Sequence, residues 1–162
     1  MKKVNVNEIK EDPWQSPRGK FAASFRGISE ALGRDGNSLD MVKRHPFDLE
    51  WTRIPPGKLN FPFHAHSAQW EMYLIVSGKG RVRDKDGTND VAAGDAFMFG
   101  PNDPHQIMNT GDTDLVYYVI ADNPIGESGY YPDSKKWKMN KTSQADRVVI
   151  KGNETDYFDG EE

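Results

Sequence analysis

The sequence predicts an all-β protein, an antiparallel barrel or sandwich built from short strands. Runs of branched and aromatic residues recur through the middle of the chain, separated by Gly, Asp, Asn or Pro. The 15 glycines and 10 prolines suit the many turns that such a fold needs. No long stretch with the apolar period of a helix interrupts these runs, so alternating strands and helices are disfavoured.

The chain has 162 residues, which is enough for one domain with its own hydrophobic core and too few for two. We expect the barrel at residues 40–122, preceded by an N-terminal arm at 1–39 that packs on the barrel or on a partner. A C-terminal extension containing several aromatic residues follows at 123–162. Within the arm, residues 21–32 suit a helix face or an edge strand equally, and both possibilities stay open.

Each expected strand is a short apolar run that ends at turn-forming residues, as at Pro55, Pro56 and Gly57. We expect strands at residues 40–43, 47–54, 63–66, 71–76, 80–83, around 91, 96–99, 105–109 and 115–121. Residues 147–151 are compatible with one more strand.

The composition argues against several classes of protein. There is no cysteine, so disulfides and thiolate metal ligands are excluded, and a reducing compartment such as the cytoplasm is expected. A formal net charge of -4 with mixed charges offers no broad basic surface, so nucleic acid is not an expected partner. Residues 1–10 lack the apolar run of a signal peptide or membrane span, so we expect a soluble protein without a membrane partner.

The most informative pattern is formed by His64, His66, Glu71 and His105, which include three of the four histidines. Successive side chains of a strand point to opposite faces, so His64 and His66 share one face. The interval from Gly78 to Gly94 is of hairpin type, with Gly87 at its turn, and it returns the chain so that His105 can approach the same interior. His45 has no neighbour that suggests a ligand role. The four residues are therefore predicted to hold one metal ion.

Neutral imidazoles and a carboxylate suit a single divalent transition metal, and Zn, Mn, Fe, Ni, Co and Cu all remain open. A six-coordinate ion would keep two positions for water or substrate, which would permit catalysis. A tetrahedral zinc ion with all four ligands would be closed.

The spacing of these residues resembles the first signature motif of the cupin superfamily. In that motif, Gly and a short spacer precede His-x-His, three or four residues, Glu, six residues and Gly. Here the motif runs from Gly57 to Gly78 through His64, His66 and Glu71, with one extra residue before the first histidine.

A second cupin motif follows, with Gly, five residues, Pro-x-Gly, two residues, His, three residues and Asn. Gly94, His105 and Asn109 keep their places in it. Gly100 and Asn102 occupy the usual Pro and Gly positions, so the turn before His105 departs from the family pattern.

The resemblance implies a double-stranded β-helix (jelly-roll) barrel that carries its metal ligands at His64, His66, Glu71 and His105. Residues 131–133 and 156–161 also look like the tail of small single-domain bacterial cupins of unassigned activity. Such proteins are usually homodimers, so the resemblance implies a homodimer.

Several other side chains are candidates for a substrate pocket, although aromatic residues on strands more often belong simply to the core. The candidate lining residues are Trp51, Arg53, Phe63 and Tyr73. Tyr73 is the candidate catalytic residue, because it is expected to share the inward face of Glu71 and could move a proton.

Two kinds of function stay open. The first is a metal-dependent enzyme on a small polar molecule; the chemistries that cupins most often imply are isomerisation of a sugar or sugar phosphate and oxygen-dependent cleavage. The second is a non-catalytic barrel that binds a small ligand or a metal as a sensor or carrier, because one fold hosts many functions.

Overall fold

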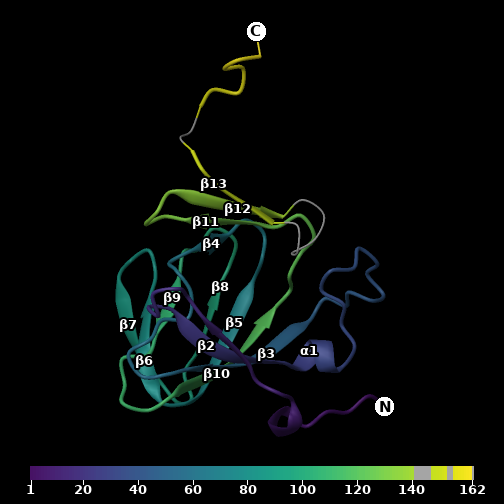
Figure 1. The fold of residues 1–162 in the computed structure, drawn as a ribbon, viewed down its shortest axis with the longest axis vertical. Coiled ribbons are helices and arrows are strands. Elements are labelled where there is room, and N and C mark those ends of the chain that lie inside the picture. The colour runs from purple at the N-terminus through teal and green to yellow at the C-terminus, as the bar shows by residue number, and fades with distance from the viewer. Residues whose placement is uncertain (141–146, 153–154, 162) are drawn as a thin grey trace.

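The computed structural model describes residues 1–140, 147–152 and 155–161, and nearly all of its regular structure is β-strand (Figure 1). The all-β prediction is confirmed. The strands are β1 (Asp12–Gln15), β2 (Ala22–Gly27), β3 (Asp48–Ile54), β4 (Ala65–His66), β5 (Glu71–Ser77), β6 (Lys79–Arg83), β7 (Thr88–Ala92), β8 (Ala96–Phe99), β9 (Gln106–Met108), β10 (Leu115–Ala121), β11 (Ser128–Tyr131), β12 (Lys136–Asn140) and β13 (Arg147–Lys151). Two short helices, η1 (Val6–Glu8) and α1 (Ile28–Ala31), accompany them.

The strands form three sheets in which neighbours run antiparallel. The largest sheet has the order β1-β2-β3-β10-β5-β8, the second has the order β7-β6-β9, and the third has the order β13-β12-β11-β4. The largest sheet and the β7-β6-β9 sheet share one core, because the buried cluster draws side chains from both. Within the described residues, none of the helices has the length and apolar composition needed to cross a bilayer.

Alternation along the strands decides which side chains enter this core. On β5, Tyr73 and Ile75 are buried, whereas Met72, Leu74 and Val76 between and beside them are exposed. Each side chain that is buried in such an interior stabilises the fold by about 1.5–3 kcal/mol relative to exposure. The inward set on β5 therefore fixes the register of the strand, because a shift by one residue would expose it to solvent.

The turn between β5 and β6 depends on Gly78, the last glycine of the first motif. This residue has φ +82°, and a Cβ built on it would lie 2.3 Å from the carbonyl oxygen of Asp114. No other residue type fits both the left-handed conformation and this close approach. The motif glycine is thus explained by packing between the turn and the chain before β10.

Residues 1–39 contribute directly to the largest sheet. β1 pairs with β2, and β2 pairs with β3. Of the two possibilities for residues 21–32, the strand holds for Ala22–Gly27, and α1 follows it. The sheet therefore begins well before residue 40, where the sequence placed the start of the barrel.

The expected strand at residues 40–43 is absent, and that prediction was wrong. The carbonyl oxygen of Asp40 accepts hydrogen bonds from the N–H groups of Lys43 and Arg44, at 3.0 and 2.8 Å, which closes a turn. The Asp40 carboxylate also accepts from the N–H of Val42. Side chains such as Asp compete for local hydrogen bonds in this way and favour turns over strands.

The C-terminal segment adds strands to the end of the barrel that carries β4. β11 pairs with β4 through Gly129 opposite His66 and Tyr130 opposite Ala65. Figure 1 shows β11, β12 and β13 lying across this end of the molecule. The further strand that residues 147–151 allowed is present as β13. Residues 141–146, 153, 154 and 162 of the expected extension lie outside the described residues.

Candidate metal centre

His64 and His105 lie directly opposite each other in an isolated antiparallel bridge. The N–H of His64 donates to the carbonyl of His105 at 3.1 Å, and the reverse bond is 2.8 Å long. His66 follows on β4, and Glu71 is the first residue of β5. One ligand atom from each of the four residues lies within 4.8 Å of the others. The structure therefore brings the whole predicted ligand set together.

The three imidazoles are oriented by hydrogen bonds at Nδ1. Nδ1 of His64 lies 2.8 Å from the carbonyl of Pro62, and Nδ1 of His105 lies 3.1 Å from the carbonyl of Asp103. A carbonyl only accepts, so in the neutral ring the proton sits on Nδ1 and the lone pair on Nε2. Partners of this kind fix the tautomer of metal-binding histidines.

Nδ1 of His66 faces a carboxylate instead. It lies 3.0 Å from Oε1 of Glu127, which also accepts from the N–H of Ser67 at 3.0 Å. Glu127 is buried and stands 61 residues after His66 in the chain. Glu127 was not among the predicted site residues, because the sequence marks it only as one of two acidic residues, with Asp122, in the short segment before β11.

Glu71 is held as a carboxylate. The phenol of Tyr73 donates to its Oε2 at 2.7 Å, and the amide of Gln69 donates to its Oε1 at 2.7 Å. Burial alone would raise the pKa of Glu71, but the close contact with His105 and the nearby imidazoles hold it well below its ordinary value. Glu71 is therefore a negatively charged donor at any physiological pH.

His64 is held as a neutral base. Burial, followed by the neighbouring imidazoles of His105 and His66, lowers the pKa of His64 to about 3. An imidazole that stays unprotonated keeps its Nε2 lone pair available for a cation at neutral pH.

Two further observations test whether these residues fit a metal ion. Nε2 of His66 is buried and has no hydrogen-bond partner among the described residues, although buried polar atoms are nearly always paired. Nε2 of His105 lies 2.8 Å from Oε2 of Glu71, so two lone pairs face each other when His105 is neutral. A cation would satisfy all of these atoms. Three imidazole nitrogens and one carboxylate oxygen therefore fit a divalent transition metal.

The turn before His105 keeps its function despite its departure from the family motif. Asn102, in place of the motif glycine, has φ +66°. Asn is one of the few residues other than Gly that adopt this left-handed conformation readily. Its N–H donates to the carbonyl of His66 at 2.7 Å, which ties the turn to β4.

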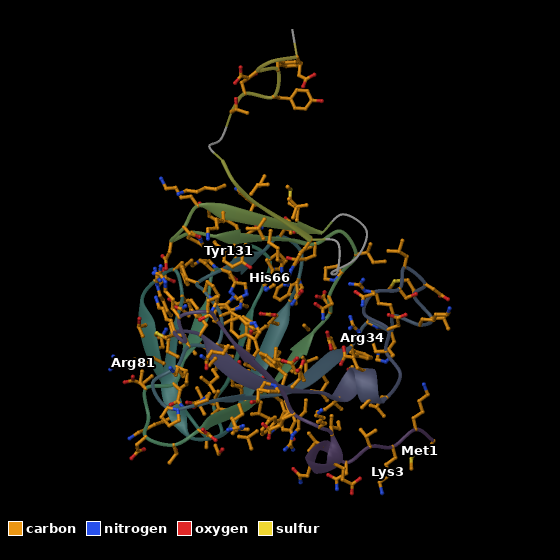
Figure 2. The ribbon with its side chains drawn as sticks, viewed as in Figure 1. Met1, Lys3, Arg34, His66, Arg81 and Tyr131 are labelled. Atoms are coloured by element: carbon orange, nitrogen blue, oxygen red, sulfur yellow. The ribbon has the colours of Figure 1, made fainter. Side chains whose placement is uncertain are left out.

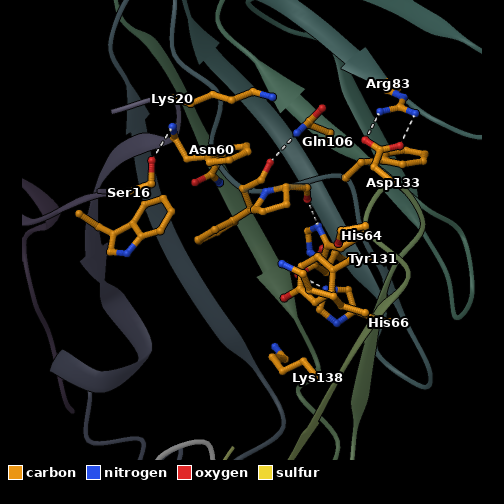
Figure 3. Close-up of a pocket in the computed structure, with 18 of the residues that line it drawn as sticks. Ser16, Lys20, Asn60, His64, His66, Arg83, Gln106, Tyr131, Asp133 and Lys138 are labelled. Atoms are coloured by element: carbon orange, nitrogen blue, oxygen red, sulfur yellow. Dashed lines mark hydrogen bonds and ion pairs between the residues drawn. The ribbon is translucent and has the colours of Figure 1, made fainter. Parts of the chain in front are cut away.

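The four candidate ligands, His64, His66, Glu71 and His105, form the donor set. Three of them, His64, His66 and Glu71, line a cavity of about 830 Å³. In Figure 3, His64, His66 and Tyr131 cluster in one part of the cavity, and Ser16, Lys20 and Asn60 lie apart from them. Figure 2 places His66 and Tyr131 near the end covered by β11 to β13. A cavity of this size suits a small-molecule ligand.

Two of the four predicted pocket residues lie in the cavity wall. Phe63 is buried, and the guanidinium of Arg83 lies 3.8 Å from the centre of its ring. Arg83 also makes a bidentate pair with Asp133, at 2.7 and 2.9 Å. Tyr73 is buried with its hydroxyl on Glu71, and burial followed by the charge of Glu71 raises its pKa well above the ordinary value.

The assignment of Trp51 and Arg53 to the pocket was wrong, because neither lines the cavity. On β3 the buried positions are Thr52 and Ile54, so the residues between them point to the outer face of the sheet. There the guanidinium of Arg26 lies 4.5 Å from the centre of the Trp51 ring. Arg53 bonds to Glu11 at 2.7 Å and to Asp114 at 3.0 Å.

Comparison with known proteins agrees with this geometry. A family model described as a cupin domain matches residues 50–121. The chain is 32% identical over 68 residues to an oxalate-binding protein of Thermotoga maritima. This match covers 42% of the chain and 55% of the relative, so it spans about half of that relative's length.

Solved structures with the same fold include a sugar phosphate isomerase of the cupin superfamily from Silicibacter pomeroyi. It has a TM-score of 0.76 and 19% identity, with 92% of each chain covered. A predicted oxalate decarboxylase from Thermotoga maritima has a TM-score of 0.60 and 23% identity, with 74% of this chain and 96% of that chain covered. At these identities the similarity shows the fold alone, and it confirms the jelly-roll barrel. Residues 50–121 of the chain therefore match the cupin domain family, and the chain has the fold of solved cupin structures.

Proposed function

We propose that this protein is a metal-dependent enzyme that isomerises a small polar molecule of the sugar or sugar-phosphate class. The observation that carries the proposal is the position of the donor set, because three of its four residues, His64, His66 and Glu71, line a cavity large enough for such a molecule. The ion held by His64, His66, Glu71 and His105 would polarise a carbonyl or hydroxyl oxygen of the substrate.

The lining of the cavity supports a polar and anionic substrate. Asn60 and Gln106 offer side-chain amides, and the cationic side chains of Lys20, Lys138 and Arg147 also line the cavity. Ammonium and guanidinium groups suit phosphate or carboxylate groups. The sugar phosphate isomerase among the structural relatives, whose fold covers 92% of this chain, supports the same substrate class.

In this function Tyr73 serves to position Glu71. Its hydroxyl donates to Oε2 of the carboxylate at 2.7 Å and lies 3.5 Å from Nε2 of His105. The raised pKa of Tyr73 keeps the phenol protonated, so it acts as a hydrogen-bond donor to the ligand residue.

The experiment is reconstitution of metal-free protein with Mn(II), Zn(II), Fe(II), Ni(II), Co(II) or Cu(II), followed by incubation with sugar phosphates in D2O. Isomerisation by proton transfer exchanges carbon-bound hydrogen with solvent, which mass spectrometry detects. We expect exchange with at least one metal and none in the metal-free protein. Equal exchange with and without metal would contradict the proposal.

A second candidate function is non-catalytic binding of a small dicarboxylate. It is favoured by the 32% identity to an oxalate-binding protein. The cavity of about 830 Å³ is much larger than oxalate, which makes this candidate the weaker one. Calorimetric titration of the metal-loaded protein with oxalate distinguishes the two, because tight oxalate binding without turnover of any sugar phosphate would favour the binding function.

The homodimer implied by the family is supported by one surface of the largest sheet. Met72 and Leu74 of β5 and Met98 of β8 are each about half exposed on the outer face, and Met72 stands opposite Met98. An exposed apolar patch on a sheet is typical of a protein interface. We expect sedimentation velocity to give a dimer and Leu74→Lys to shift it to a monomer.

A further inference from the structure

Glu50 is a partly buried carboxyl group that lines the cavity without belonging to the donor set. It pairs in the sheet with Val119 of β10, which pairs in turn with Tyr73 of β5. Adjacent strands lie about 4.8 Å apart, so the Cα atoms of Glu50 and Tyr73 are roughly 10 Å apart. Both side chains line the same interior. Glu50 thus lies on the same wall of the cavity as Tyr73, two strands away, and faces the interior that His64, His66 and Glu71 also line.

The carboxyl group of Glu50 has one hydrogen-bond donor, the hydroxyl of Thr52, at 3.0 Å. In the part of the chain that the structure describes, no lysine, arginine or histidine forms an ion pair with it. The charged groups that act on it most strongly are negative: Asp48 on its own strand, Glu30 on α1 and Glu71 on β5. The phenols of Tyr73 on β5 and Tyr117 on β10 are the other titratable groups facing it.

These surroundings favour the protonated form. Burial, opposed by the hydrogen bond from Thr52 and reinforced by Asp48, Glu30 and Glu71, raises the pKa of Glu50 to about 7. At neutral pH both protonation states are populated. A group in this condition can take a proton and return it within one reaction cycle.

The other carboxyl groups of the cavity wall and its two buried phenols are engaged. Glu71 belongs to the donor set, and the phenol of Tyr73 donates to it. Tyr117 is fully buried and bonds to the side-chain amide of Asn60. Asp133 is paired with Arg83. Glu50 is therefore the wall residue best suited to move a proton on a bound substrate.

We propose that Glu50 is the catalytic acid–base residue of this site, a role that rests on the proposed isomerase function. Its carboxylate removes the proton from the carbon next to the substrate carbonyl. The electron pair of that C–H bond forms a C=C bond, the π pair of the C=O bond moves to oxygen, and this oxygen takes a proton from solvent water to give an enediol. Glu50 then gives its proton to the former carbonyl carbon, while the neighbouring hydroxyl loses its proton and becomes the new carbonyl. Atoms and electrons balance, and no external oxidant or reductant is needed.

The test compares wild type with Glu50→Gln, which keeps the shape of the side chain and its bond from Thr52 but cannot accept the proton. Each protein is loaded with the metal that supports exchange and incubated with fructose 6-phosphate or ribulose 5-phosphate in D2O. We expect deuterium uptake by Glu50→Gln to fall at least 100-fold, with unchanged metal content and a KM within threefold. Glu8→Gln is the matched control, because it makes the same change at an exposed carboxylate outside the cavity.

The outcomes separate the two proposals. Exchange by wild type and by Glu50→Gln at similar rates would overturn the role of Glu50 and leave the isomerase function standing. No exchange by wild type with any of the six metals would overturn the function, and the role of Glu50 with it.

A second measurement on the unmodified protein covers the case in which Glu50→Gln does not fold. The rate of exchange should rise with pH through an apparent pKa near 7, at constant metal content, because the carboxylate is the form that removes the proton. A rate that is flat between pH 6 and pH 8.5 would overturn the proposal.

Discussion

Oε2 of Glu71 and Nε2 of His105 lie 2.8 Å apart. Nδ1 of His105 faces the carbonyl of Asp103, so the neutral ring has no proton left for Glu71. Two acceptors at this distance repel each other unless a cation lies between or beside them. The contact is therefore the local feature of the protein that most directly calls for a bound ion.

Removal of one donor tests the metal centre. We expect His66→Ala to lose most of its bound metal, because Nε2 of His66 is a buried donor atom with no hydrogen-bond partner among the described residues. Inductively coupled plasma mass spectrometry of freshly purified protein measures the content. His45→Ala is the control, because that histidine lies outside the donor set. Equal metal content in the two variants would contradict the assignment.

Replacement of Glu127 tests whether its hydrogen bond orients the imidazole of His66 for metal binding. Its carboxylate accepts from Nδ1 of His66 at 3.0 Å, so Glu127→Gln should weaken that bond while keeping the fold. Loss of a hydrogen-bond partner of this kind typically lowers metal affinity by about 10- to 100-fold. Competition with a chromogenic chelator measures the dissociation constant. An affinity equal to that of wild type would show that the bond does not orient the imidazole.

Tyr73 tests which side chain transfers the proton. Tyr73→Phe removes one hydrogen bond to Glu71, which should cost about 1–3 kcal/mol of stability because a buried carboxylate loses a donor. We expect metal to remain bound and deuterium exchange to fall less than tenfold. A loss of exchange as large as that expected for Glu50→Gln would instead make Tyr73 the proton donor or acceptor.

The raised pKa of Glu50 also predicts how the stability of the protein depends on pH. Its pKa rises from 4.5 to about 7 on folding, so between these values the unfolded chain releases a proton that the folded protein keeps. The free energy of unfolding therefore falls as pH rises through this window, by up to about 3 kcal/mol. Glu50→Gln has no carboxyl group at this position and escapes this loss. Its stability relative to wild type should therefore increase from pH 5 to pH 8. Urea denaturation of the metal-free proteins at both values measures the difference, and an unchanged difference would exclude the raised pKa.

Replacement of Arg53 tests whether its side chain lies on the outer face of β3, away from the cavity. Its guanidinium joins Glu11 and Asp114 but is about one-third exposed, so solvent screens both pairs. We expect Arg53→Ala to lose about 1 kcal/mol or less and to keep wild-type metal content and KM. A large rise in KM for a sugar phosphate would place Arg53 in the binding site after all.

Much of the fold and of the ligand set could be predicted because strands have a period of two. That period alone puts His64 and His66 on one face. The mainly apolar run that begins at Glu71 predicts β5 from its first residue. The same rule did not tell which face of β3 is inside, since Trp51 and Arg53 alternate with Thr52 and Ile54. Both faces carry apolar side chains, and only the packing of the sheet against its partners chose between them.

The sequence by itself determined the all-β class and the candidate metal ligands, because each depends on local spacing or on the chemistry of single side chains. The tertiary structure alone decided that Glu127 supports His66 from 61 residues away, and that Glu50 lines the same cavity as the donor set. These relationships arise when β3, β4 and the segment before β11 come together in space. No periodicity along the chain encodes the distance between such segments, because it is set by how the sheets close around the core.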